Sequence, residues 1–186
     1  MSQSDLLIEA VEALERAGVG YMLTGSFVSS LQGEPRATHD IDLVIEADMR
    51  AVDALAGVFR APRYYFDAVA ARSALGQSDM FNLLDTSTGD KVDFWAITDS
   101  PFDVSRFARR IPVAVFGASI VVSSPEDTIL QKLKWSAASG GSERHFNDAL
   151  GVYELQAGVL DESYLDEWAE HLGVADLLAH VRSAAM

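Results

Sequence analysis

The spacing of apolar residues divides the chain into a part that mixes strands with helices and a later part that is helical only. Apolar runs and period-two alternation predict strands at 21–23, 40–45, 80–84, 91–97 and, in two runs broken at 116–118, within 111–122. Helical spacing predicts helices over 4–17, 27–31, 48–59, 67–75, 101–107, 125–138, 142–156, 161–172 and 174–183. We therefore expect an α/β core over 1–122 and a helical carboxyl-terminal region over 123–186.

Polar residues at the ends of these runs predict where individual elements begin and end. Ser4 is predicted to cap the first helix, which would stop at Gly18. Ser124 followed by Pro125 is a typical helix start, because proline fits the first helical position. The turn at 87–90 separates two apolar runs and predicts a hairpin.

The turn at Gly25 and Ser26 is the first stretch that suggests chemistry. An apolar strand runs into it, and a segment of small residues follows. At the start of a helix, the first backbone N–H groups are unsatisfied and the helix dipole is positive, so a phosphate is able to bind there. A glycine at the turn leaves room for its close approach.

Three aspartates are predicted to face a common point. In Asp40-Ile41-Asp42-Leu43, the period of two places both carboxylates on one face of a strand. The same alternation sets Asp93 apart from its apolar neighbours, and Asp93 joins the pair if the two strands are adjacent. Carboxylates that share a face repel one another unless a cation lies between them, and Mg²⁺ is the hard divalent ion that such oxygens favour. A phosphate cradle beside these acids suggests metal-assisted phosphoryl or nucleotidyl transfer.

This combination of residues resembles the nucleotidyltransferase superfamily with the polymerase-beta-like fold. The segment 33–43, Gly-Glu-Pro-Arg-Ala-Thr-His-Asp-Ile-Asp-Leu, is similar to small bacterial members related to AbiE-type toxins. The resemblance implies an α+β (mixed α/β) fold, with a twisted mixed sheet flanked by helices and a helical carboxyl-terminal region. It also implies a Mg²⁺-dependent enzyme that moves a nucleoside monophosphate from an NTP to an acceptor hydroxyl.

The resemblance assigns roles to residues in both parts of the chain. Asp40 and Asp42 would hold Mg²⁺, and Asp93 would complete a second metal position and help to deprotonate the acceptor. Gly25 and Ser26 would cradle the β- and γ-phosphates.

Further basic and polar residues are candidates for the nucleotide. Arg36 and Thr38 lie near it in similar proteins, although Arg36 is equally consistent with a surface arginine. Lys132, Arg144 and Asp148 resemble the helical elements of AbiE-like toxins, with Asn147 in place of a second base. A solvated helix face is the alternative for each of these helical residues.

The acceptor stays open between several classes. A toxin-like enzyme would modify an RNA end or a protein hydroxyl, and it would have an antitoxin partner. An enzyme that modifies an aminoglycoside or lincosamide-type drug is the alternative, because a net charge of −14 attracts a cationic acceptor. A non-catalytic protein that binds a nucleotide or a partner is the third hypothesis.

The composition limits the kinds of site, location and binding partner that are possible for this protein. The chain has no cysteine, which excludes disulfides and thiolate metal sites and fits a cytoplasmic protein. We expect no signal peptide and no membrane span, because no apolar run is long enough. Twenty-eight acidic against fourteen basic residues argue against non-specific nucleic-acid binding. Trp95 and Trp135 are expected in the core, and His39 is expected to face away from the aspartates.

Overall fold

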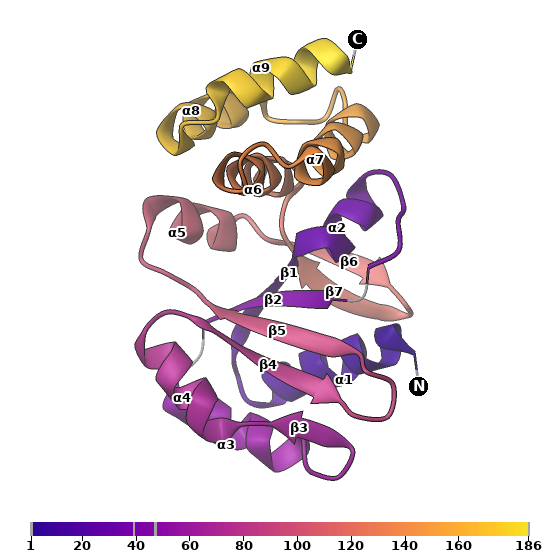
Figure 1. The fold of residues 1–186 in the computed structure, drawn as a ribbon, viewed down its shortest axis with the longest axis vertical. Helices are drawn as coiled ribbons and strands as arrows, with labels where there is room; N and C mark the ends of the chain where they lie inside the picture. Colours follow the sequence, from indigo (N-terminus) through magenta and orange to yellow (C-terminus); the bar gives the residue numbers. More distant parts are fainter. Residues whose placement is uncertain (1, 39, 47, 186) are drawn as a thin grey trace. The chain divides into compact units, whose positions relative to one another are not determined.

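The structure is a computed structural model that describes residues 2–38, 40–46 and 48–185 of the chain. The described chain folds as two compact units, one formed by residues 1–24 and 38–122 and the other by 25–37 and 123–186. Figure 1 shows the sheet in the first unit and helices only in the second. The second unit consists of two segments of the chain. One is residues 25–37, and the other starts at Ser123, close to the predicted boundary. The division into two functional domains stays a prediction.

Seven strands form one sheet in the part of the chain that the structure describes. They are β1 (Gly20–Thr24), β2 (Asp40–Glu46), β3 (Tyr64–Phe66), β4 (Met80–Asp85), β5 (Lys91–Ala96), β6 (Ile111–Val115) and β7 (Ala118–Val122). Their order is β3-β4-β5-β2-β1-β7-β6. The pairs β2–β5 and β1–β7 are parallel, and the other neighbours are antiparallel. The predicted mixed sheet with flanking helices is therefore confirmed.

Helices of the first unit cover this sheet. They are α1 (Gln3–Arg16), α3 (Met49–Val58), α4 (Ala68–Gly76) and α5 (Pro101–Ala108). Helix α1 packs against β1 and β5, α3 packs against α1, and α4 packs against α3 and β4 (Figure 1). The predicted helices over 48–59, 67–75 and 101–107 are confirmed to within one or two residues.

The two faces of the sheet have different roles. Strand β2 places Ile41, Leu43 and Ile45 in the core, where each is at most 1% exposed. Its other side chains point to the opposite face. On that face Val44 packs with Met22 and with Phe107 of α5, and Trp95 packs against this small cluster. The cluster anchors one end of the face on which the aspartates lie.

The second unit is a group of helices. Its elements are α2 (Gly25–Gln32), α6 (Pro125–Ala138), α7 (Glu143–Leu155), α8 (Glu162–Leu172) and α9 (Ala175–Ala184). Helix α7 packs against α2, α6 and α9. At Gly33, directly after α2, a Cβ atom would lie 2.7 Å from the backbone nitrogen of Val152. This glycine lets the backbones of α2 and α7 approach closely.

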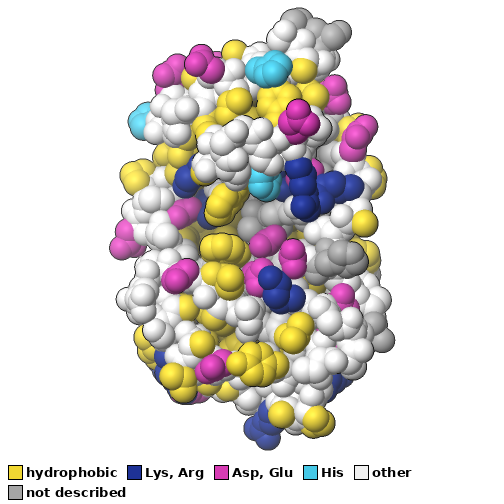
Figure 2. Space-filling view, in the orientation of Figure 1, with side chains coloured by type: hydrophobic (Ala, Val, Ile, Leu, Met, Phe, Trp, Pro, Cys, Tyr) yellow, Lys and Arg dark blue, Asp and Glu magenta, His cyan; other side chains and the backbone are white. Residues whose placement is uncertain are grey.

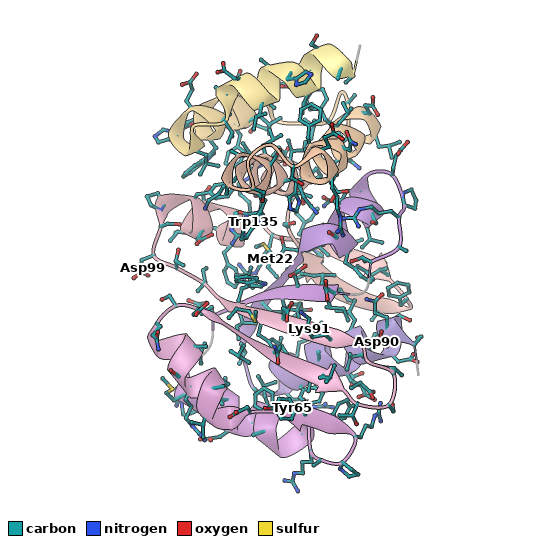
Figure 3. The ribbon with its side chains drawn as sticks, in the orientation of Figure 1. Met22, Tyr65, Asp90, Lys91, Asp99 and Trp135 are labelled. Carbon is teal, nitrogen blue, oxygen red and sulfur yellow. The ribbon has the colours of Figure 1, made fainter. Side chains whose placement is uncertain are left out.

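Two sequence predictions are wrong in detail. Ser2 caps α1, because its hydroxyl accepts from the backbone N–H of Asp5 while the Asp5 carboxylate accepts from that of Ser2. Ser4, the predicted cap, lies inside the helix. Trp135 was expected in the core, but it lies on α6 and is 44% exposed (Figure 3). Among the described helices, none has the length and apolar character that a membrane span requires.

Candidate functional site

Two adjacent parallel strands bring the three aspartates to one face of the sheet. In the β2–β5 pair, Asp42 lies directly opposite Asp93, and Asp40 lies opposite Lys91. Because side chains alternate along a strand and paired residues share a face, Asp40, Asp42 and Asp93 lie on the same side. Asp93 is only 6% exposed, whereas the Asp40 side chain is 60% exposed. The aspartates thus run from solvent towards the interior.

Lys91 lies on β5 and supplies the cation nearest to these carboxylates (Figure 3). Its Nζ is 2.8 Å from Oδ2 of Asp93 and 3.6 Å from Oδ1 of Asp40. The hydrogen bond to Asp93, followed by attraction to both carboxylates, raises the pKa of Lys91. The ammonium therefore reduces the repulsion between the two strands' acids.

The remaining contacts orient the carboxylates. Trp95, two residues after Asp93 on the same face, donates its indole N–H to Oδ1 of Asp42 at 3.2 Å. Oδ1 of Asp93 is buried and has no hydrogen-bond partner among the described residues. A buried carboxylate oxygen without a partner is costly, so this atom is suited to a ligand.

The arrangement fits a divalent cation by its chemistry. Its described residues offer oxygen ligands on one face, including an orphaned buried oxygen on Asp93, and oxygen ligands are what Mg²⁺ requires. As the side chains are placed, no three Asp, Glu, His or Cys groups within the described ranges form a metal cluster. The positive group among these acids is the Lys91 ammonium.

A second group of polar residues surrounds Ser26 in the helical unit. Gly25 begins α2 with a φ of 73°, a conformation that favours glycine, as the sequence predicted for a sharp turn. The Ser26 hydroxyl accepts hydrogen bonds from Arg36 Nη2 at 2.6 Å and from Lys132 Nζ at 3.1 Å. Two cationic side chains thus converge on a hydroxyl in the first turn of a helix.

Asp148 of α7 holds both of these cations. Its Oδ1 is 2.7 Å from Arg36 Nε and its Oδ2 is 2.8 Å from Arg36 Nη2, a two-point ion pair. Oδ2 also accepts from Lys132 Nζ at 2.5 Å. The Lys132 and Asp148 side chains are 5% and 8% exposed. Two positive charges against one negative charge leave a formal net charge of +1 beside Ser26.

Electrostatics within this cluster favour the ionised form of Asp148 and the neutral form of His145. Burial alone would raise the pKa of Asp148, but hydrogen bonds from Arg36 and Lys132 lower it below its ordinary value. The pKa of the nearby His145 is also lowered, first by burial and then by the positive charge of Lys132. Nδ1 of His145 is buried without a hydrogen-bond partner in the described part of the chain.

The other predicted residues have more peripheral positions. Thr38 is half-buried and donates to the backbone carbonyl of Asp40 at 3.4 Å. Arg144 is exposed on α7. Two residues after the buried Lys132, Lys134 is exposed on α6, because residues two apart point to different sides of a helix. The prediction about His39 lies outside the described residues.

The sequence interpretation did not single out Lys91, and it expected Trp95 in the core rather than beside Asp42. Both lie two positions from Asp93 on the same strand, so the period of two places them on its face. That signal was available, but nothing in the sequence indicated which charged residue would pair with which aspartate.

Surface charge agrees with the composition. On the face drawn in Figure 2, Asp and Glu side chains are spread widely, and Lys and Arg side chains are fewer. This distribution is unfavourable for long-range attraction of a polyanion.

Comparison with known proteins gives the fold. No family model matches the chain. The solution structure of the antibiotic-resistance factor ANT(2'')-Ia is similar over 98% of this chain and 94% of its own, with 14% identity and a TM-score of 0.54. The crystal structure of ANT(2'')-Ia with adenylyl-2''-tobramycin covers 100% of both chains, with 15% identity and a TM-score of 0.55.

A third solved structure is also similar to this chain. It is an antigenic nucleotidyltransferase-like protein from Paracoccidioides brasiliensis, similar over 95% of this chain and 91% of its own, with 17% identity and a TM-score of 0.53. At this level of identity the comparisons establish the fold, which is that of nucleotidyltransferases.

Proposed function

We propose that this protein is a nucleotidyltransferase, which moves a nucleoside monophosphate from an NTP to an acceptor hydroxyl. The observation that supports this most directly is the pairing of Asp42 with Asp93 on adjacent parallel strands, with Asp40 on the same face. Three acids on one face are unfavourable for folding alone. Their placement on one face is explained if they bind a cation that in turn binds the phosphates of the NTP.

Asp40, Asp42 and Asp93 would hold Mg²⁺. The orphaned Oδ1 of Asp93 and the oxygen-only donor set support this assignment. When bound, the ion supplies charge neutralisation at the transferred phosphate and lowers the pKa of the acceptor hydroxyl.

The Ser26 cluster would bind the phosphates that leave. Arg36 and Lys132 supply positive charge, the start of α2 supplies unsatisfied N–H groups, and Asp148 keeps both cations oriented. In the chain, Gly25 and Ser26 directly follow Thr24, which pairs with Asp42.

The reaction would proceed in one displacement. The acceptor oxygen forms a bond to the α-phosphorus, the bond to the β-phosphate oxygen breaks, and pyrophosphate leaves. Asp93, with its buried Oδ1 directed to the ion, would also help to take the proton of the acceptor hydroxyl. Lys91 holds the other oxygen of Asp93 and so keeps Oδ1 directed to the reaction.

An RNA end or a protein hydroxyl is the toxin-like acceptor. The buried contact between Lys132 and Asp148 supports it, since Lys132, Arg144 and Asp148 follow one another in the order that resembles AbiE-like toxins. An antitoxin partner would accompany this function. The exposed position of Arg144 leaves it available to such an acceptor.

A cationic drug of the aminoglycoside or lincosamide type is the second candidate acceptor. The net charge of −14 favours it, and ANT(2'')-Ia, whose structure contains adenylyl-2''-tobramycin, is similar over the whole chain.

Label transfer tests the function and separates these acceptors. The full chain is incubated with Mg²⁺ and each of the four NTPs labelled at the α-phosphate, together with RNA, with protein or with tobramycin. We expect one acceptor class to become labelled. Asp40→Asn should abolish labelling, and Lys134→Met, which changes an exposed lysine, should retain it. Binding of an NTP without labelling of any acceptor would instead support the non-catalytic hypothesis.

A further inference from the structure

The ammonium of Lys91 lies between Asp40 and Asp93, where a positive charge reduces the repulsion of the two carboxylates. It lies within 2.8 Å of Asp93 Oδ2 and 3.6 Å of Asp40 Oδ1, so it joins the first and the third acid. Both acids face the same side of the sheet, and Lys91 is opposite Asp40 in the β2–β5 register. Strand geometry therefore directs the lysine to these carboxylates.

The formal charges indicate how many divalent ions the group accommodates. Three carboxylates and one ammonium sum to −2, which a single divalent cation neutralises. In the protein without bound nucleotide, two divalent cations would leave a net charge of +2 beside Asp93, which is only 6% exposed. Uncompensated charge at a buried position is unfavourable.

We propose that the ammonium of Lys91 takes the place of a second divalent cation between Asp40 and Asp93, so that the three aspartates bind one divalent ion. This inference rests on the proposed function and revises the expectation of two ions. Lys91 is a positioning residue in this scheme, because it acts through the carboxylates it holds.

The unpaired oxygen of Asp93 is consistent with one carboxylate oxygen being held by Lys91 and the other being left for the single ion. Lys91 occupies Oδ2, and the buried Oδ1 is left without a partner. Trp95 similarly occupies one oxygen of Asp42 with its N–H. Each of these two acids thus has one oxygen held by a neighbour on β5.

Counting bound Mn²⁺ tests the proposal without measuring activity. The full chain is freed of metal, titrated with Mn²⁺, and the free ion is followed by electron paramagnetic resonance. A double variant, Asp40→Asn with Asp42→Asn, gives the background of weak surface binding that an acidic protein shows. We expect the wild type to bind one ion more than this background, and Lys91→Met to bind two more.

Two variants serve as controls: one keeps the positive charge at position 91, and the other removes a lysine elsewhere. Lys91→Arg retains a cation and should bind one ion, and Lys134→Met, which removes an exposed lysine, should also bind one. Lys91→Gln serves as the neutral variant if Lys91→Met fails to fold.

Two results would overturn the role of Lys91 and leave the proposed function intact. These are a wild type that binds two ions above background, and a neutral Lys91 variant that still binds one. If the wild type binds no more Mn²⁺ than the double aspartate variant, both this inference and the proposed function fail.

Discussion

Arg36 and Asp148 form a two-point ion pair although they lie 112 positions apart, with Arg36 Nε 2.7 Å from Oδ1 and Nη2 2.8 Å from Oδ2. The pair joins the loop after α2 to α7. It also fixes the guanidinium beside Ser26. One carboxylate therefore both stabilises the helical unit and orients the positive groups of the candidate phosphate site.

Removing the charge of Asp148 should be costly. In Asp148→Asn, the buried Lys132 ammonium and the Arg36 guanidinium lose their counter-charge, and we expect a loss of about 3 kcal/mol in the free energy of unfolding. Urea denaturation measures it. Asp166→Asn is the control, because Asp166 pairs with Arg182 at the surface and should cost less than about 1 kcal/mol. Equal losses in the two variants would contradict a special role for Asp148.

Replacing Trp95 by Phe should separate orientation of Asp42 from packing. The variant keeps an aromatic ring against Met22 and Val44 but loses the N–H donor to Asp42. Loss of a group that hydrogen-bonds to a metal ligand typically lowers metal affinity or activity by about 10–100-fold. We expect the Mn²⁺ affinity of the variant to fall within that range. Isothermal titration measures it. Unchanged affinity would show that the indole hydrogen bond does not orient the carboxylate.

The close approach at Gly33 predicts a steric effect. A methyl group there would meet Val152 N at 2.7 Å, Gly151 C at 2.8 Å and Ser29 O at 2.9 Å, all of them backbone atoms that cannot rotate away. Gly33→Ala should therefore destabilise the protein by about 1–3 kcal/mol, as overpacking does. Thermal unfolding measures the change.

Gly57 provides the matched control for this substitution. It lies inside α3, and a Cβ there would meet nothing within 4 Å. Gly57→Ala should stabilise the protein by about 0.5–1 kcal/mol, because alanine favours the helix interior. A Gly33→Ala variant that is as stable as Gly57→Ala would mean that α2 and α7 separate without cost.

The lowered pKa of His145 predicts a pH dependence of stability. Its ordinary pKa is 6.5, and burial followed by the charge of Lys132 lowers it in the folded state. As the pH falls through about 6.5, the unfolded chain takes up a proton before the folded one does, so the free energy of unfolding decreases. His145→Gln should show a smaller decrease between pH 7.5 and pH 5.5.

The control for His145 changes an exposed histidine. His171→Gln removes a side chain at the surface of α8 and should retain the wild-type slope of stability against pH. Denaturant midpoints at several pH values give both slopes. An unchanged slope in His145→Gln would place the titration elsewhere.

Sequence periodicity predicted the elements other than the three-residue strand β3, and it predicted the face of each acid. The period of two in β2 separates Asp40 and Asp42 from the buried Ile41 and Leu43, and the Gly25 turn follows from local backbone conformation. These features depend on neighbours in the chain. Two predictions were wrong. The cap of α1 is Ser2 and not Ser4, a choice between two serines two positions apart. Trp135 is exposed and not buried, which depends on tertiary contacts.

The amino-acid sequence by itself therefore determined the strands, the helices and the alternation that aligns Asp40 with Asp42, because each depends on local spacing. Only the tertiary structure decided that β5 pairs with β2 in the register that sets Asp93 opposite Asp42, and that Lys91 contacts two of the acids. It also decided that Asp148 holds Arg36 and Lys132. These partners are distant in sequence, and no local preference selects among the charged residues available. Packing of the whole chain makes that choice.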